Sequence, residues 1–129
     1  MKILIAGHGE LPEALAGSAR MIGGELPDVE FIGLPPGDTP QGLRDRMLEI
    51  LDDFSAELIL TDLAGGTPDN VANLIAKSGK IPSVRFIVAG VSLPLLLEFA
   101  LSGADANDLN LDEVISESGA VVRFTSHLN

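Results

Sequence analysis

The sequence predicts an α/β domain: a parallel sheet of about four strands with helices on both of its faces. Three observations support this fold class. Short apolar runs alternate with segments of helical periodicity, proline and glycine mark the changes between them, and each helical segment between strands has about ten residues or more. Strands joined by such helices run parallel through right-handed crossovers. A chain of 129 residues fits one domain, 1–129.

The first half of the chain contains two expected strand–helix pairs. A buried strand is expected over residues 2–7, and Pro12 lies in the first turn of the following helix, where its missing N–H is tolerated. A second strand is expected over 29–34. Thr39 is then expected to cap a helix that extends to Phe54.

The second half repeats the pattern. Each helix again begins near a serine, threonine or asparagine, whose side chain can accept a hydrogen bond from the first turn. The expected elements are a strand over 57–62, a helix capped by Thr67 that ends near Gly79, a strand over 84–89, a helix capped by Ser92 that reaches Leu101, and a shorter helix over 109–118 capped by Asn110.

A last strand is expected over 120–125, antiparallel and at an edge of the sheet. Arg123 interrupts its apolar, β-branched pattern, which is typical of an edge strand. Such a strand can cover the edge of its own sheet or that of a second subunit, because exchange of a terminal element is a simple route to a dimer. The sequence leaves both arrangements open.

The composition narrows the classes of function. The formal charge is −11, from 8 basic and 19 acidic side chains, which disfavours nucleic acid and anionic membranes as partners. Cysteine is absent, which excludes disulfides and thiolate metal sites. No apolar run is long enough to span a bilayer and no signal peptide is recognisable, so a cytoplasmic protein is expected.

Two polar residues at strand ends form the candidate catalytic pair. His8 follows the first expected strand, and Asp62 ends the third. In open α/β sheets, sites form beyond the carboxyl ends of the strands. A carboxylate bonded to one imidazole nitrogen fixes the tautomer and leaves the other nitrogen as a nucleophile, which suits phosphoryl chemistry. The simpler interpretation of His8 is an exposed loop residue.

A glycine-rich turn follows Asp62. Gly65, Gly66 and Thr67 open the third expected helix, and the free amides and dipole of a helix N-terminus attract anions. A phosphoryl group on His8 would find donors there, although Thr67 in a tight turn can also serve only to cap the helix. The turn is neither a Walker loop nor a dinucleotide-binding fingerprint, so nucleotide binding is not supported.

Metal and hydrolase chemistry fit the sequence less well. The chain has two histidines, which lie far apart and give no metal-ligand spacing. No Gly-x-Ser-x-Gly turn supplies a nucleophilic serine, so a hydrolase with His8 as its base is the weakest alternative. We therefore expect no metal and no cofactor.

Three blocks of sequence carry a family resemblance. They are Gly7-His8-Gly9, the segment Asp62-Leu-Ala-Gly-Gly-Thr-Pro, and the segment Ala89-Gly-Val-Ser-Leu-Pro-Leu-Leu-Leu-Glu. In order and spacing they resemble the IIA component of the mannose/fructose/sorbose class of the phosphoenolpyruvate-dependent sugar phosphotransferase system. The resemblance extends over nearly the whole chain, so that 1–129 would be a single domain of this family.

The resemblance implies a phosphotransferase that works through a phosphohistidine. His8 would accept a phosphoryl group from the carrier HPr and pass it to a separate IIB component, which in turn serves the membrane components IIC and IID. Asp62 would orient His8. Gly65, Gly66 and Thr67 would surround the phosphoryl group. The family is usually homodimeric, with the C-terminal strand exchanged between subunits.

Three residues depart from the family pattern. Asp69 stands where an apolar residue often follows the proline, and Glu10 and Pro12 replace a more apolar stretch after the histidine. They add charge or rigidity near the expected docking surface. Two other functions stay open: a regulatory phosphoacceptor domain of the same family, and an α/β module that binds an anion at the glycine-rich turn without becoming phosphorylated.

Overall fold

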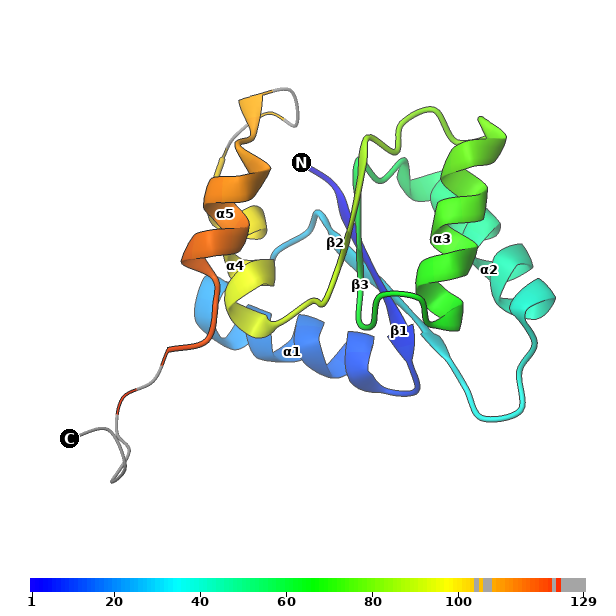
Figure 1. The fold of residues 1–129 in the computed structure, drawn as a ribbon, viewed down its shortest axis with the longest axis horizontal. Coiled ribbons are helices and arrows are strands. Elements are labelled where there is room, and N and C mark those ends of the chain that lie inside the picture. Colours follow the sequence, from blue (N-terminus) through cyan, green and yellow to red (C-terminus); the bar gives the residue numbers. More distant parts are fainter. Residues whose placement is uncertain (104, 106–107, 122, 124–129) are drawn as a thin grey trace.

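One parallel sheet organises the molecule (Figure 1). The computed structural model describes residues 1–103, 105, 108–121 and 123. Within them, β1 (Ile3–His8), β2 (Val29–Leu34), β3 (Leu58–Thr61) and β4 (Phe86–Ala89) pair in the order β2-β1-β3-β4, all parallel. The prediction of a parallel sheet of about four strands is confirmed.

The two central strands are buried on both faces. All of β3 is buried, and so is β1 as far as Gly7, leaving only its last residue, His8, exposed. This explains why both strands read as continuous apolar runs rather than alternating ones. Their ends differ slightly from the expected bounds: β1 continues through His8, and β3 stops before Asp62.

Helices cover both faces of the sheet, as predicted. In Figure 1, α1 (Leu11–Gly23) and α4 (Leu93–Leu101) lie on one side, and α2 (Pro40–Phe54) and α3 (Thr67–Ser78) on the other. A fifth helix, α5 (Leu111–Glu117), packs against α4. This arrangement follows from right-handed crossovers that run one way from β1 to β2 and the opposite way afterwards.

Two apolar clusters flank the sheet and form the core. One joins the inward residues of α1 and α4 to one face, and it includes Ala16, Leu96 and Phe99. The other joins α2 and α3 to the opposite face, with Met47 and Ile75 at its centre. The sheet thus lies between two helical layers, and each of its faces packs against one of them.

The capping predictions hold for three helices and fail for one. The side chains of Thr39, Ser92 and Asn110 accept hydrogen bonds from the first turns of α2, α4 and α5. Thr67, in contrast, is the first residue of α3, and Gly66 occupies the cap without a side-chain hydrogen bond. The expected cap at Thr67 is therefore wrong, and its hydroxyl is not used to cap the helix.

The expected last strand over 120–125 lies largely outside the described residues. Of that stretch the structure describes Ala120, Val121 and Arg123, and none of these three is in a strand. An exchanged strand and a homodimer thus remain predictions. Among the described residues, no helix is long and apolar enough to cross a membrane.

Candidate active site

The strand order brings His8 and Asp62 together. β1 and β3 are neighbouring parallel strands, and their last paired residues are Ala6 and Thr61. The residues that follow these two in each strand therefore lie at the same edge of the sheet. The order in which strands are added to the sheet also changes sides between β1 and β3: β2 lies on one side of β1, and β3 and β4 lie on the other. Ligand sites in doubly wound sheets form at such a switch point, beyond the carboxyl ends of the strands.

One oxygen of Asp62 holds both the backbone and the ring of His8. Oδ2 lies 2.8 Å from the imidazole Nδ1 and accepts the amide N–H of His8 at 2.9 Å. Because a carboxylate only accepts hydrogen bonds, the neutral form of the imidazole carries its proton on Nδ1 and keeps the lone pair on Nε2. The His8 side chain is 49% exposed, whereas that of Asp62 is 9% exposed. The pair thus combines an anchored carboxylate with an accessible imidazole.

The environment keeps Asp62 ionised. Burial raises the pKa of this carboxyl, but hydrogen bonds from the amide and ring of His8, together with the attraction of the His8 charge, outweigh burial and lower the pKa below its ordinary value of 3.8. The second oxygen, Oδ1, is buried and has no hydrogen-bond partner within the described residues. The negative charge therefore acts mainly on His8.

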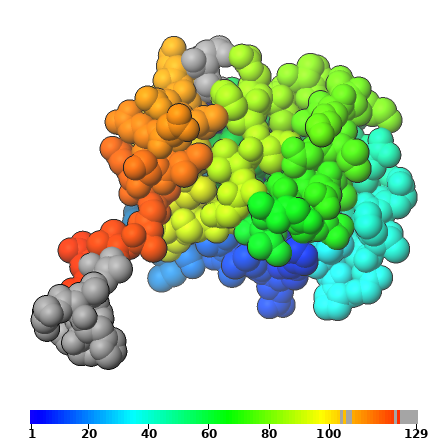
Figure 2. Space-filling model, viewed as in Figure 1, coloured from blue at the N-terminus to red at the C-terminus, as the bar shows by residue number. Residues whose placement is uncertain are grey.

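Two glycines leave room for this pair. A Cβ atom at Gly7 would lie 3.0 Å from Asp62 Cγ, and one at Gly66 would lie 3.0 Å from His8 Cε1. Both distances are shorter than ordinary van der Waals contact. Glycine at position 66 thus allows the β3–α3 loop to approach the imidazole. In Figure 2, green atoms of the middle of the chain lie against the blue N-terminal segment.

The amides of the glycine-rich turn are used inside the loop. The N–H of Gly65 donates to Asp69 Oδ2 at 3.0 Å, and that of Gly66 donates to the carbonyl of Leu63 at 3.0 Å. The expectation that both amides are free for an anion is therefore not met. Thr67 is different, because its hydroxyl makes no hydrogen bond within the part of the chain that the structure describes.

Asp69 does not add an exposed charge, contrary to the expectation from the sequence. It is only 9% exposed and both of its oxygens accept hydrogen bonds. Two signals pointed to it: a threonine at the end of a buried strand, and an acidic residue at the third position of a helix, from which side chains reach back to preceding amides.

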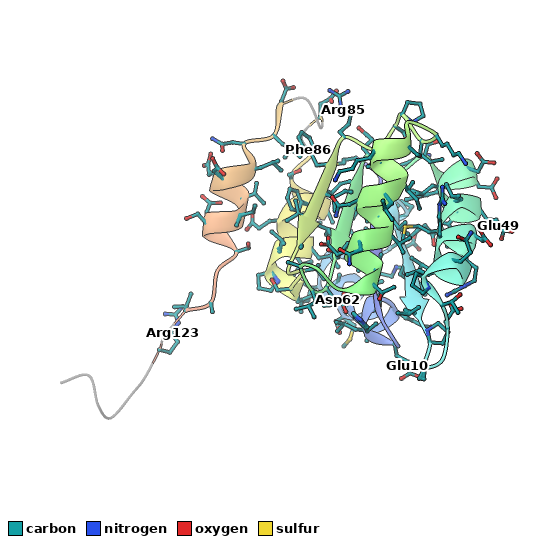
Figure 3. The ribbon with its side chains drawn as sticks, turned by 45° about the vertical axis from the view of Figure 1, so that its right-hand side comes forward. Glu10, Glu49, Asp62, Arg85, Phe86 and Arg123 are labelled. Atoms are coloured by element: carbon teal, nitrogen blue, oxygen red, sulfur yellow. The ribbon has the colours of Figure 1, made fainter. Side chains whose placement is uncertain are left out.

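The other two departures lie beside His8. Pro12 is buried at the start of α1, so it stiffens the helix entrance rather than the surface. Glu10 is exposed and lines a hollow of about 360 Å³ together with Glu13 and Arg46. Figure 3 shows Glu10 and Asp62 toward the same edge of the molecule. Glu10 therefore adds an exposed carboxylate two residues after His8, in a hollow that Arg46 also lines.

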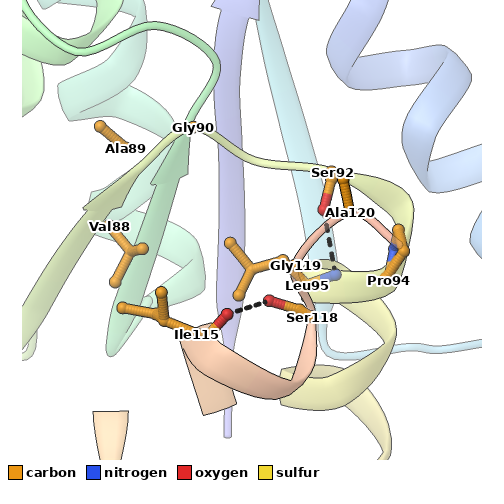
Figure 4. Close-up of a pocket in the computed structure, with 10 residues that line it drawn as sticks. All are labelled: Val88, Ala89, Gly90, Ser92, Pro94, Leu95, Ile115, Ser118, Gly119 and Ala120. Carbon is orange, nitrogen blue, oxygen red and sulfur yellow. Dashed lines mark hydrogen bonds between the residues drawn. The ribbon is translucent and has the colours of Figure 1, made fainter. Parts of the chain in front are cut away.

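A larger hollow of about 480 Å³ lies apart from this pair, at the carboxyl end of β4 (Figure 4). It opens between the start of α4 and α5, with Ser92 and Ile115 on its walls, and neither His8 nor Asp62 lines it. We therefore assign the candidate active site to the His8–Asp62 pair and not to this hollow. Among the described residues, no three His, Asp or Glu side chains gather as a metal site.

Fold and site together define a class: a doubly wound α/β domain with a carboxylate-oriented imidazole at its topological switch point. Comparison with known proteins narrows it. A family model described as "PTS system fructose IIA component" matches residues 2–117. The PTS sorbose-specific EIIA component of Lacticaseibacillus casei is 33% identical over 119 residues, which cover 90% of this chain and 81% of that protein.

Two further comparisons agree. The PTS fructose-specific EIIA component of Bacillus subtilis strain 168 is 36% identical over 102 residues, covering 76% of this chain and 67% of that protein. A crystal structure of the phosphotransferase system component EIIA from Streptococcus agalactiae superposes with a TM-score of 0.78 at 31% identity, over 91% of each chain. The chain therefore belongs to the EIIA-man family of IIA components of the phosphotransferase system. This confirms the resemblance.

Proposed function

We propose that this chain is a phosphohistidine relay in sugar uptake. His8 accepts a phosphoryl group from phosphorylated HPr and passes it to a separate IIB component, which supplies the membrane components IIC and IID. The observation that carries the proposal is the 2.8 Å contact between Asp62 Oδ2 and His8 Nδ1, because it leaves Nε2 as an exposed nucleophile. Membership of the family supports the same role.

In the proposed transfer step, the lone pair of His8 Nε2 attacks the phosphorus atom of the donor phosphohistidine. The P–N bond to the donor ring breaks, and its electron pair returns to the donor nitrogen. His8 keeps its Nδ1 proton throughout, so the phosphorylated ring is cationic, and the Asp62 carboxylate stabilises that charge. The protein contributes orientation and electrostatic stabilisation, which are the main requirements of phosphoryl transfer.

The loop facing His8 suits a group that must leave again. Gly66 provides space next to the ring, and the Thr67 hydroxyl is proposed to donate to a phosphoryl oxygen. Since the amides of Gly65 and Gly66 are used within the loop, their proposed role is to shape the surroundings of the phosphoryl group. A group held by few donors is readily passed on to the next carrier.

The surroundings of His8 favour a basic partner surface. The chain carries a formal charge of −11, and Glu10 and Glu13, together with Arg46, line a hollow that includes Gly9, the residue after His8. Complementary charge accelerates encounter and selects partners. This supports docking of a donor whose phosphohistidine is framed by basic residues.

The proposal is tested by intact-mass measurement after incubation with phosphoenolpyruvate, enzyme I and HPr. We expect one acid-labile phosphoryl adduct on the wild type and none on His8→Ala. The matched control is His127→Ala, which removes the only other histidine and should keep the adduct.

Omitting HPr should abolish the adduct, which identifies the donor. Wild type without an adduct in the presence of phosphorylated HPr would overturn the proposal and favour reversible anion binding at the same turn. An adduct that cannot be passed to IIB would instead indicate a regulatory phosphoacceptor.

A further inference from the structure

We propose that Asp69 is a positioning residue for phosphoryl transfer: it ties the β3–α3 loop to the buried end of β3 and so fixes both groups that face His8. This inference rests on the function proposed above and adds a residue that neither holds nor touches the transferred group.

The tie consists of the shortest hydrogen bond to each carboxylate oxygen; Oδ1 also accepts a longer one from Asn73 Nδ2, at 3.4 Å. The Thr61 hydroxyl donates to Asp69 Oδ1 at 2.7 Å, and the Gly65 amide donates to Oδ2 at 3.0 Å. Thr61 is fully buried and Asp69 is 9% exposed, so water competes little for these bonds. The Asn73 side chain donates to the Asp69 carbonyl at 2.8 Å, which holds the residue in the first turn of α3.

A carboxylate fits this position better than an apolar side chain would. It lies in the first turn of α3, where the helix dipole stabilises negative charge. An apolar side chain would leave the buried Thr61 hydroxyl without this acceptor, and an unsatisfied buried hydroxyl is destabilising. The buried Thr61 hydroxyl and the Asp69 carboxylate therefore depend on each other as hydrogen-bond donor and acceptor.

Each end of the tie is one residue away from a group that faces the imidazole. Thr61 precedes Asp62, whose carboxylate holds Nδ1, and Gly65 precedes Gly66, whose backbone lies beside Cε1. The Thr61 carbonyl also accepts the amides of Gly90 and Val91, both at 2.9 Å, which anchors it to the β4–α4 loop. Loss of the tie would therefore loosen the loop relative to the carboxylate.

The expected kinetic signature separates positioning from docking. The Thr61 and Asp69 side chains are buried, so a carrier docked on the surface would make little direct contact with them. Misplacement of a reacting group by a fraction of an ångström lowers the rate of the chemical step, whereas binding of the carrier is unaffected. A lower maximal rate with an unchanged KM for phosphorylated HPr is therefore expected.

The test uses Asp69→Asn, Thr61→Val and Thr61→Ser in the full chain. Asn cannot accept at both positions, and Val removes the hydroxyl at similar volume, so each should lower the maximal rate about ten-fold with KM changed less than about two-fold. Ser retains the hydroxyl and should restore most of the rate. Asp52→Asn, at an exposed acid on α2, is the matched control and should match wild type.

A second readout does not depend on activity. Amide hydrogen exchange at Gly65, followed by NMR, should accelerate about ten-fold in Asp69→Asn, because its N–H loses the acceptor. If Asp69→Asn fails to fold, the Thr61→Val and Thr61→Ser pair decides by the same measurements.

The outcomes distinguish the two proposals. If wild type accepts no phosphoryl group, the proposed function fails. If wild type is phosphorylated but Asp69→Asn and Thr61→Val transfer at its rate, or change only KM, positioning by Asp69 is overturned while the relay stands. Equal losses in Val and Ser would also overturn it, because the hydroxyl would then not be the cause.

Discussion

At the scale of single residues, the site depends on one carboxylate oxygen. Asp62 Oδ2 accepts two hydrogen bonds from His8, one from the backbone and one from the ring. The backbone bond fixes the carboxylate relative to the end of β1, and the ring bond then sets the orientation of the imidazole. The orientation of Nε2 is thus set by the position of the Asp62 carboxylate relative to the backbone of β1.

Replacing this carboxylate should separate orientation from charge. In Asp62→Asn the side-chain oxygen can still accept from His8, but the negative charge that stabilises the phosphorylated ring is lost. We expect phosphoryl transfer to slow by about 100-fold or more, as for related carboxylate–imidazole pairs. Rapid-quench measurement with phosphorylated HPr reports this rate.

Asp53→Asn, at an exposed acid on α2, is the control for a change of net charge and should keep the wild-type rate. An Asp62→Asn rate within about two-fold of wild type would mean that the carboxylate is not part of the mechanism.

At the scale of elements, the start of α3 decides how closely the loop approaches the imidazole. Gly66 has φ −73° and ψ 167°, a conformation open to any residue, so an alanine there would be unstrained in its backbone. Its Cβ, however, would meet His8 Cε1 at 3.0 Å and the Leu63 carbonyl at 3.2 Å. The absence of a side chain at position 66 therefore makes room first for the imidazole, which is the closest contact, and second for the Leu63 carbonyl of the same turn.

Gly66→Ala should impair transfer more than it impairs folding. The added methyl displaces the ring or the loop, and we expect transfer to slow about ten-fold or more while the thermal unfolding temperature stays near that of wild type. The two measurements together check this: transfer from phosphorylated HPr and calorimetry.

Gly17→Ala is the control for glycine replacement in open space. A Cβ at Gly17, in the exposed face of α1, meets nothing within 4 Å. The free energy of unfolding should therefore rise by about 0.5–1 kcal/mol. Transfer by Gly66→Ala at the wild-type rate would show that the loop yields freely to the methyl group.

At the scale of the whole molecule, both helical layers support the carboxyl edge. The apolar clusters on the two faces share the central strands β1 and β3, because successive residues of these strands point to opposite faces. Neither layer can therefore separate from the sheet without exposing residues that the other needs. We expect the described domain to unfold as a single cooperative unit.

Core substitutions on the two faces should consequently behave alike. Met47 and Leu96 are fully buried on opposite sides of the sheet. Met47→Ala and Leu96→Ala should each lower the free energy of unfolding by about 2–5 kcal/mol, because each leaves a cavity. In urea, the midpoint should fall with an unchanged slope, as for two-state unfolding.

Leu74→Ala, at a residue that is 61% exposed on α3, is the control and should stay within about 0.5 kcal/mol of wild type. A change of slope, or two separate transitions, in either core variant would contradict the single unit.

Much of the architecture could be predicted because its signals are local. Buried strands, first-turn prolines at Pro12 and Pro68, and the caps at Thr39, Ser92 and Asn110 each depend on neighbours within a few residues. The candidate pair could be predicted as well, since parallel strands bring their carboxyl ends to one edge of the sheet. The cap at Thr67 failed because threonine competes there with a glycine that adopts the cap conformation as readily.

The sequence by itself thus determined the order of strands and helices and the nature of the reacting pair. Only the tertiary structure decided the strand order β2-β1-β3-β4 that brings His8 to Asp62, the use of the Gly65 and Gly66 amides within their own loop, and the buried link between Thr61 and Asp69. The physical reason is that packing decides which polar groups lose contact with water. From the sequence, Asp69 is expected to be a surface charge. Only the fold shows that its two oxygens accept hydrogen bonds from groups that would otherwise lack a partner.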